Sequence, residues 1–309
     1  MIEPLVTIAI TTKDRPLLAH RAVRSALSQD LTDFEVVVVD DGSDPPFRLD
    51  FEDHRVRVIH RDVPGGPCAA RNAALHAARG AWIMFLDDDD RLLPDMVSVS
   101  LACVRSSSLP APVAVLTGIQ LVDDSDRIVE ERMPRTFALG ADYFLEEPLE
   151  GRSFQTHNTL LVPTTVLVDA GGWDEEMAGT EHDDLFLRLN QMCSIQGLDR
   201  VTYLMTAHHG ERRSKDVLAR ARAMERTVGK HAAAFSRHRG RHSRYLTVMG
   251  ISYLRAGRWL PAVRGTWNGV MVNPFRWRGW VYFAAALAGP RVWSALSRVI
   301  GDRWRPPKP

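Results

Sequence analysis

The sequence lacks the long apolar run that a membrane-spanning helix needs. Its run Val281–Leu287 covers about seven residues, far short of the ~20 that cross a bilayer. No basic stretch precedes the first expected strand, so we expect no signal peptide. Cysteine is also scarce: Cys68, Cys103 and Cys193 have no metal-type spacing and are expected to be reduced thiols. These absences favour a cytoplasmic globular protein.

Acidic residues are rare in the last third of the chain. Residues 211–309 contain 21 Lys plus Arg and 4 Asp plus Glu, whereas residues 1–210 contain 18 basic and 34 acidic residues. The 309 residues, 45% of them hydrophobic, can bury one large core and an appendage. We therefore predict a domain over 1–210 and a basic, aromatic-rich region over 211–309.

The basic region has helical patterns over Val217–Ala234, Arg244–Ala256 and Trp259–Met271. Beyond Pro274, aromatic residues stand among arginines: Phe275, Trp277, Trp280, Tyr282 and Phe283. Such a mixture suits peripheral attachment to the anionic inner face of a membrane. It equally suits a helical cap on the core or a dimer interface. No recognition motif supports nucleic-acid binding.

Four consecutive aspartates, Asp87–Asp90, directly follow the apolar run Trp82–Leu86. The run predicts a buried strand, and open α/β sheets bind ligands at the carboxyl ends of their strands. Adjacent carboxylates repel one another unless a cation compensates them, and Mg²⁺ or Mn²⁺ prefers such oxygen ligands. The pattern indicates a metal–phosphate site, with a solvated acidic turn as the alternative. Pro94 is well placed to open the next helix.

Two more predicted strands end in polar residues. Phe34–Val39 leads into Asp40 and Asp41, and Leu5–Ile10 leads into Thr11–Arg15. Parallel strands would bring these residues to the same edge of one sheet.

Two helices are expected to follow these strand ends. Pro16 is expected to begin one of them, and Gly65-Gly66 to lead into another with Arg71 in its first turn. Helix N-termini and arginines both suit anionic oxygens.

These segments, in this order, resemble the family 2 glycosyltransferases of the GT-A fold. The blocks are Val6–Thr12, Val38–Ser43, Ala70–Ala74, Phe85–Asp90, Gly171–Glu175 and Asp184–Leu189. The resemblance covers about residues 4–210 and implies an α/β, Rossmann-like and mostly parallel central sheet flanked by helices, with a C-terminal helical appendage. It also implies a nucleotide-binding half at about 1–110 and an acceptor half at about 111–210.

The resemblance assigns roles at the nucleotide-sugar donor. It implies that Asp41, beside Asp40, accepts the imide N–H of uracil or thymine. Thr11, Thr12 and Arg15 are expected to frame the nucleoside, and Arg71 to lie near the diphosphate. Asp88 is expected to face the ribose or the sugar.

The resemblance also implies a divalent metal, Mn²⁺ or Mg²⁺, that bridges the diphosphate. Asp87, Asp88 and Asp89 occupy the DxD motif, with Asp89 the expected direct ligand together with Asp87. Asp90 is expected to lie behind them. His209, ahead of His208, matches a histidine that approaches the metal or the diphosphate, and a surface loop is the alternative.

The chain departs from the family pattern at the catalytic base. Relatives place an aspartate where His182 stands, so the candidates are His182, Asp183 and Glu181. A general base must accept the proton of the attacking hydroxyl, and imidazole titrates near neutral pH. Asp184 is expected to anchor the start of the helix. The segment 153–159 suits either sugar contacts or an ordinary loop.

The implied function is metal-dependent, inverting transfer of a sugar from a UDP- or dTDP-sugar to a glycan or lipid-linked acceptor, in polysaccharide, glycolipid or cell-envelope glycan synthesis. The alternative, motivated by His182, is a non-catalytic nucleotide-sugar-binding or scaffold protein. A sugar nucleotidyltransferase is disfavoured because residues 7–16 contain no glycine.

Overall fold

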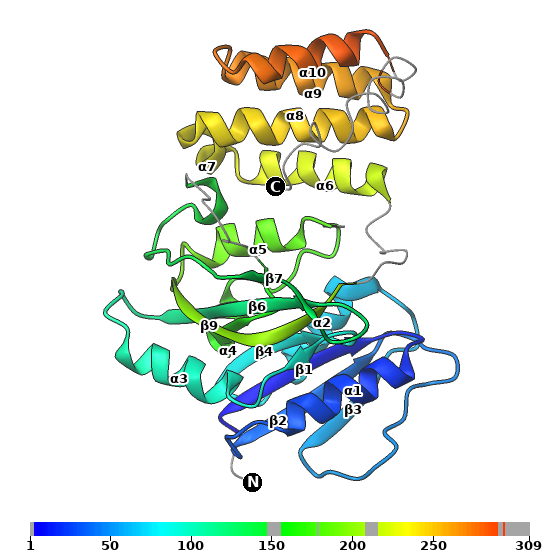
Figure 1. Cartoon of the computed structure of the whole chain (residues 1–309), viewed down its shortest axis with the longest axis vertical. Helices are drawn as coiled ribbons and strands as arrows, with labels where there is room; N and C mark the ends of the chain where they lie inside the picture. The colour runs from blue at the N-terminus through cyan, green and yellow to red at the C-terminus, as the bar shows by residue number, and fades with distance from the viewer. Residues whose placement is uncertain (1–2, 147–155, 178, 208–215, 290–292, 294–309) are drawn as a thin grey trace. The chain divides into compact units, whose positions relative to one another are not determined.

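The computed structural model describes residues 3–146, 156–177, 179–207, 216–289 and 293. Contacts among them form two compact units (Figure 1). The first unit comprises the described residues of Met1–Tyr143, Pro148–Glu175 and Leu185–Gly210, and the second those of Phe144–Glu147, Glu176–Asp184 and Glu211–Pro309. Two short segments, 144–147 and 176–184, thus group with the residues beyond 210.

The strands all lie in the first unit. Their bounds are β1 (Val6–Thr12), β2 (Phe34–Asp40), β3 (Val56–His60), β4 (Trp82–Asp87), β5 (Arg91–Leu92), β6 (Val113–Val122), β7 (Ile128–Arg132), β8 (Leu160–Pro163) and β9 (Ser194–Thr206). Among the described residues they form one sheet in the order β3-β2-β1-β4-β8-β6-β9-β5, with β7 on β6. Strands β3, β2, β1 and β4 are parallel, as are β6 and β9. The predicted α/β fold is confirmed.

Helices cover both faces of the parallel strands. The helices α1 (Pro16–Leu27) and α3 (Met96–Ser106) pack on the face that carries Ile8, Val36 and Met84. The helix α2 (Gly66–Ala77) contacts β1 and β2 through the alternate side chains. Strands that are covered on both faces have continuous apolar sequences, which is why they are easy to recognise in the amino-acid sequence.

One helix start is as predicted and two differ from the prediction. Pro16 is the first residue of α1, as predicted. The helix α3 begins at Met96, so Pro94 lies in the preceding turn and does not open it. Arg71 is in the second turn of α2, because this helix already begins at Gly66.

The rest of the first unit contains short elements around β6, β8 and β9. The helix α4 spans Thr164–Asp169, and a 3₁₀ helix spans Tyr143–Leu145, of which only Tyr143 belongs to the first unit. The helix α5 (Glu181–Leu189) has its residues from Leu185 onward in the first unit.

The second unit is helical, as predicted. It contains α6 (Val217–Lys230), α7 (Ala232–Arg237), α8 (Arg239–Arg255), α9 (Trp259–Val272) and α10 (Trp277–Leu287). The helices α8 and α9 pack closely because Gly250 and Gly265 face each other without side chains. Among the described residues, no helix combines the length and the apolar character needed to cross a bilayer.

Candidate functional site

The carboxyl ends of β1, β2 and β4 lie level with one another. The strand register pairs Thr12 with Asp40 and Thr11 with Asp87. Ligands bind beyond this edge in open α/β sheets. The structure therefore brings together the polar residues that were predicted at three separate strand ends.

The buried carboxylate of Asp40 accepts hydrogen bonds from the loop that follows β2. Oδ1 accepts the amide of Ser43 at 3.1 Å, and Oδ2 accepts the amide of Phe47 at 2.8 Å. The Nδ1 atom of His60 lies 3.1 Å from Oδ2. Burial opposes ionisation, but these donors outweigh it and hold the pKa of Asp40 below its ordinary value. Asp40 thus shapes the loop that presents Asp41.

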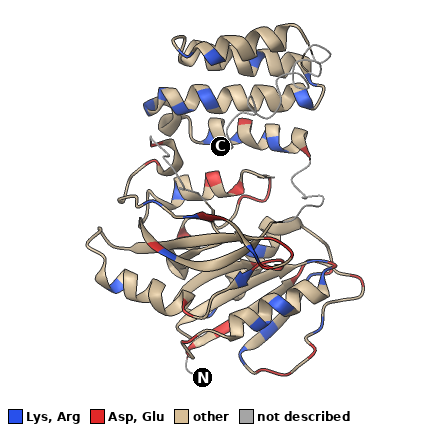
Figure 2. Ribbon diagram, in the orientation of Figure 1, with Lys and Arg blue, Asp and Glu red and all other residues tan. Residues whose placement is uncertain are grey.

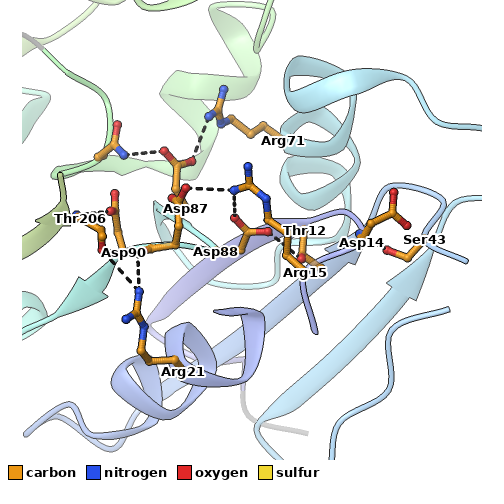
Figure 3. A network of polar contacts seen from close by, with 12 residues as sticks. Thr12, Asp14, Arg15, Arg21, Ser43, Arg71, Asp87, Asp88, Asp90 and Thr206 are labelled. Atoms are coloured by element: carbon orange, nitrogen blue, oxygen red, sulfur yellow. Dashed lines mark hydrogen bonds and ion pairs between the residues drawn. The ribbon is translucent and has the colours of Figure 1, made fainter. Parts of the chain in front are cut away.

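The loops that follow β1 and β2 are joined by hydrogen bonds. The amide of Asp14 donates to Ser43 Oγ at 2.9 Å, and the amide of Asp44 donates to Asp14 Oδ1 at 3.1 Å. Gly42 has a φ of +75°, and a Cβ there would lie 2.8 Å from Pro64 Cγ. Only glycine fits this turn without strain. Figure 3 shows Asp14 and Ser43 together at the edge of the site.

Asp41 connects the end of β2 to the start of α2. Its carboxylate accepts the amides of Gly65 at 3.0 Å and Gly66 at 2.7 Å, and it forms a close ion pair with Arg61. These partners hold Asp41 at a helix N-terminus, where a negative charge is favourable.

Asp88 and Arg15 are held against each other at the end of β1. Thr12 Oγ1 donates to Asp88 at 2.8 Å, and Arg15 Nη1 lies 3.2 Å from Asp88 and 3.0 Å from Asp89 (Figure 3). Burial raises the pKa of Asp88 to about 6, against the opposing hydrogen bond from Thr12. Arg15 therefore bridges two of the four predicted carboxylates.

Asp87 has a partner on each carboxylate oxygen. Arg71 Nη2 donates to Oδ1 at 3.1 Å, and Asn158 Nδ2 donates to Oδ2 at 2.7 Å. The buried guanidinium of Arg71 also lies over the ring of Trp173, 5.0 Å from its centroid. The orientation of Asp87 is thus fixed from α2 and from the segment before β8.

Asp90 is the most buried of the four aspartates, with 3% of its surface exposed. Its carboxylate accepts Tyr203 Oη at 2.8 Å and the amide of Thr206 at 2.9 Å. Burial, and then the charges of Asp87 and Asp89, raise the pKa of Asp90 well above its ordinary value. A cation among these carboxylates would reverse that repulsion.

Asp87, Asp89 and Asp90 each offer an oxygen within 4.8 Å of the others. Three converging hard oxygen donors fit Mg²⁺ or Mn²⁺, which take carboxylate ligands and leave positions for phosphate. Asp90 therefore joins the cluster instead of lying behind it. His209, the remaining predicted metal ligand, lies outside the described residues.

The sequence did not reveal several partners of the aspartates. These are Arg21, Arg61, Asn158, Tyr203 and Thr206. Arg21 Nη2 donates to the carbonyl oxygen of Asp89 at 2.8 Å. Thr206 is the last residue of β9, and a polar residue at a strand end is a usable signal, whereas Tyr203 lies inside that strand.

The three candidate bases lie in the first turn of α5, in the second unit. The Nε2 atom of His182 is 3.1 Å from Asp183 Oδ1, and Tyr245 of α8 donates to Asp183 Oδ2 at 3.0 Å. The side chain of His182 is 31% exposed and that of Asp183 is 5% exposed. Burial lowers the pKa of His182, but the neighbouring carboxylate of Asp183, and then that of Glu181, raise it further, so the net shift is upward.

Asp184 lies in the first turn of α5, where it was expected, and it also has partners outside this helix. It is fully buried, and its carboxylate lies 2.8 Å from His231 Nε2 and 2.9 Å from Lys230 Nζ. These two partners come from the end of α6 and the residue after it. Asp184 thus attaches the segment that carries the candidate bases, Glu181–Asp183, to the C-terminal helices.

A cavity of about 420 Å³ lies in the second unit among α6, α8 and α9. Its lining is mainly apolar and includes Leu246, Met249 and Leu260. None of the predicted site residues lines it, so its chemistry is separate from the sheet edge.

The geometry of the strand ends agrees with a comparison to known families. The family model for Glycosyl transferase family 2 matches residues 7–108. The chain carries a family 2 glycosyltransferase domain. The matched range contains Asp41, Arg71 and Asp87–Asp90, whereas the candidate bases Glu181, His182 and Asp183 lie beyond residue 108.

Two curated relatives illustrate the extent of the similarity. The succinoglycan biosynthesis protein ExoO of Rhizobium meliloti is 40% identical over 115 residues, 36% of this chain and 32% of ExoO. The GalNAc(5)-diNAcBac-PP-undecaprenol beta-1,3-glucosyltransferase of Campylobacter jejuni is 32% identical over 101 residues, 31% of this chain and 33% of the relative. The chain spans about a third of the length of the curated relatives it matches first.

Solved structures extend the likeness to most of the chain. The crystal structure of S. aureus TarS 1–349 in complex with UDP-GlcNAc matches with a TM-score of 0.58 at 18% identity, over 86% of this chain and 81% of the TarS chain. At this identity the match shows the fold, and it confirms the GT-A architecture.

Proposed function

We propose that the protein transfers a sugar from a UDP- or dTDP-sugar to an acceptor hydroxyl, with inversion at the anomeric carbon. The observation that carries this proposal is the convergence of Asp87, Asp89 and Asp90, beside Arg71 and Arg15, inside the family 2 match. Clustered carboxylates beside paired cations suit a metal-bound diphosphate.

The metal would be held by Asp87, Asp89 and Asp90. When bound, a divalent ion stabilises the charge that develops on the departing diphosphate. Asn158 and Arg71 keep Asp87 turned toward its neighbours, and Tyr203 does the same for Asp90. Such supporting hydrogen bonds orient metal ligands in many sites.

The donor would lie across the ends of β1, β2 and β4. Arg71 supplies a buried cation for the diphosphate, and Asp88, held by Thr12, supplies an acceptor for sugar or ribose hydroxyls. Asp41 would face the base from its position at the start of α2, and there its partners Arg61 and the Gly65 amide would compete with the nucleotide. We therefore propose that the side chain of Arg61 moves away from Asp41 when the donor binds.

The acceptor hydroxyl would lose its proton to His182 as its oxygen bonds to the anomeric carbon. The bond from that carbon to the diphosphate oxygen breaks with its electron pair on the leaving nucleotide. Because Nε2 of His182 pairs with Asp183, Nδ1 is the nitrogen available for the proton. Asp183 itself is buried between His182 and Tyr245, which favours a supporting role for it. Glu181 stays the other candidate on the same turn.

The names of the relatives suggest the setting. ExoO is named for succinoglycan biosynthesis, and the Campylobacter jejuni relative is named for an undecaprenol-linked substrate. We therefore propose a glycan or lipid-linked acceptor in cell-envelope polysaccharide synthesis.

Nucleotide binding tests the donor site directly. Calorimetric titrations with UDP, dTDP, GDP and CDP, each with and without Mn²⁺, should give binding for UDP or dTDP that requires the metal and is lost in Asp89→Ala. Ligand that binds only the native state also raises the melting temperature. Absence of binding by all four nucleotides with Mn²⁺ present would refute the donor site.

A non-catalytic nucleotide-sugar-binding protein is the second candidate, favoured by one observation. The neighbouring carboxylate of Asp183 raises the pKa of His182, which favours its protonated form and lowers the neutral fraction that can accept a proton. Release of UDP or dTDP from a bound donor sugar, dependent on Mn²⁺ and on acceptor, distinguishes an enzyme from this alternative.

A further inference from the structure

An apolar stripe runs along the outer side of α10. Its exposed residues are spaced three or four apart, as on one face of a helix: Trp277, Trp280, Val281, Ala284 and Leu287. Trp277 is 59% exposed and Leu287 is 51% exposed. The opposite side of α10 is buried by packing on α8 and α9. The stripe therefore leaves apolar side chains exposed along α10.

The stripe continues onto α9 and the loop between the two helices. The ring of Trp267 lies 6.3 Å from that of Trp280 and 5.0 Å from that of Phe283. Met271, one turn beyond Trp267, is 56% exposed, and Phe275 in the loop is 95% exposed. We call Trp267, Met271, Phe275, Trp277, Trp280, Val281 and Leu287 the aromatic face.

Only positive charges accompany the aromatic face. The sequence has no acidic residue between Glu225 and Asp302, and in Figure 2 the charged residues of α8, α9 and α10 are all Lys or Arg. Arg258, Arg264 and Arg278 are exposed on or beside α9 and α10. The exposed apolar side chains thus lie among charged residues that are all positive.

The exposed aromatic side chains and the neighbouring positive charges together indicate which kind of partner would bind. Tryptophan is enriched where a protein meets the headgroup region of a bilayer, because its ring is apolar and its N–H is polar. Basic side chains are attracted to the negative surface of anionic lipids. A second copy of this chain would instead bring like charges together, which is unfavourable.

We propose that the aromatic face docks on the surface of an anionic lipid bilayer. Trp277, Trp280 and Phe275 enter the interfacial layer, and the exposed arginines contact lipid phosphates. The helices α9 and α10 then lie in the plane of the membrane, as amphipathic interfacial helices do. This proposal rests on the second unit alone and holds whether or not the sheet edge binds a nucleotide.

Vesicle co-sedimentation of the full chain tests it. Vesicles of phosphatidylglycerol and phosphatidylcholine should bind the protein at low salt, and pure phosphatidylcholine vesicles should bind it much more weakly. Each of Arg258→Gln, Arg264→Gln and Arg278→Gln should weaken binding about fivefold, because one basic residue near an anionic surface contributes ~1 kcal/mol. Added salt should weaken it as well.

A matched pair of triple variants tests the apolar part. Trp277→Gln/Trp280→Gln/Val281→Gln should lose at least about tenfold in vesicle binding, because each side chain loses burial in the interface. The control Ile128→Gln/Val129→Gln/Val168→Gln removes three apolar side chains with exposed fractions of 60%, 63% and 51% from the first unit, and it should bind like the parent. Melting curves confirm that both variants are folded.

Three outcomes would overturn the proposal. The first is failure of the parent to bind anionic vesicles at low salt, and the second is equal binding by the two triple variants. The third is a concentration-dependent dimer, seen by sedimentation velocity, that the aromatic-face variant abolishes, because a second copy would then be the occupant.

Discussion

The sheet edge of the first unit and the helices α9 and α10 of the second place charge and apolar surface in opposite ways. In the first unit, Asp90 is 3% exposed and Asp88 is 7% exposed, each held by hydrogen bonds at the sheet edge. In the second unit the charged groups of α9 are outside and so are the aromatic rings of Trp267 and Trp277. Burying carboxylates is unfavourable without compensation, and so is exposing tryptophan. Both arrangements therefore indicate a ligand: a cation and a diphosphate in one unit, a lipid surface in the other.

Removal of a carboxylate from the metal cluster should have the largest effect. Asp89→Asn keeps the size of the side chain and deletes one charged ligand, so Mn²⁺-dependent sugar transfer should fall at least about a hundredfold. The control Asp62→Asn removes the same charge at an exposed position and should retain activity. Release of the nucleoside diphosphate is the measurement, and near-parental activity in Asp89→Asn would contradict the metal assignment.

Removal of the amide that supports Asp87 should have the next largest effect. Asn158→Ala deletes the 2.7 Å hydrogen bond to Oδ2 of Asp87 and should weaken Mn²⁺ binding about 10- to 100-fold. Calorimetric titration of Mn²⁺ in the presence of UDP measures it. Gln120→Ala is the control, because its amide bonds only to Glu131 on the neighbouring strand; equal metal affinity in the two variants would refute the supporting role.

A glycine pair probes the packing of the second unit. A Cβ at Gly250 would lie 2.7 Å from the amide nitrogen of Thr266, whereas one at Gly229 would meet no atom within 4 Å. Gly250→Ala should lower the free energy of unfolding by about 1–3 kcal/mol through overpacking. Gly229→Ala should raise it by about 0.5–1 kcal/mol, because alanine favours a helix interior. Denaturant unfolding measures both, and changes of equal sign would contradict the close approach of α8 and α9.

The smallest expected effect is a displacement of a pH profile. His182 must be neutral to act as a base, and the net effect of its surroundings raises its pKa. On the acidic side of the pH profile, kcat should therefore fall with a midpoint above about 6.5, the ordinary pKa of histidine. Asp183→Asn removes the charge that raises this pKa and should move the limb to lower pH. The stability from the ion pair is present below pH ~6.5 and is lost as pH rises through the raised pKa.

The pH experiment also separates the candidate bases. Complete loss of transfer in Asp183→Asn, with UDP binding intact, would make Asp183 the base in place of His182. An unchanged profile would point to Glu181.

The strand ends could be predicted because each depends on a local pattern. An apolar run followed by carboxylates identified β2 and β4, and their parallel register then placed Asp40 and Asp87 at one edge. Burial on both faces makes such runs continuous and easy to recognise. The helical character of 217–271 followed from periodicity in the same way.

The partners of these carboxylates could not be predicted, because they come from distant parts of the chain. Asn158 is 71 residues from Asp87, and Tyr203 is 113 residues from Asp90. Neither residue stands in a pattern that distinguishes it from an ordinary loop or strand residue. The pairing of Asp184 with His231 was hidden for the same reason, since 47 residues separate them.

The bonds of the base segment also affect how such proteins can diverge. Asp183 and Asp184 depend on Tyr245, Lys230 and His231, all supplied by the C-terminal helices. Exchange of those helices for an unrelated appendage would leave a fully buried carboxylate at Asp184 without its partners Lys230 and His231, which is strongly destabilising. An exchange of the C-terminal region that preserves stability should therefore include residues 176–184, and an exchange at residue 210 alone should give a less stable protein.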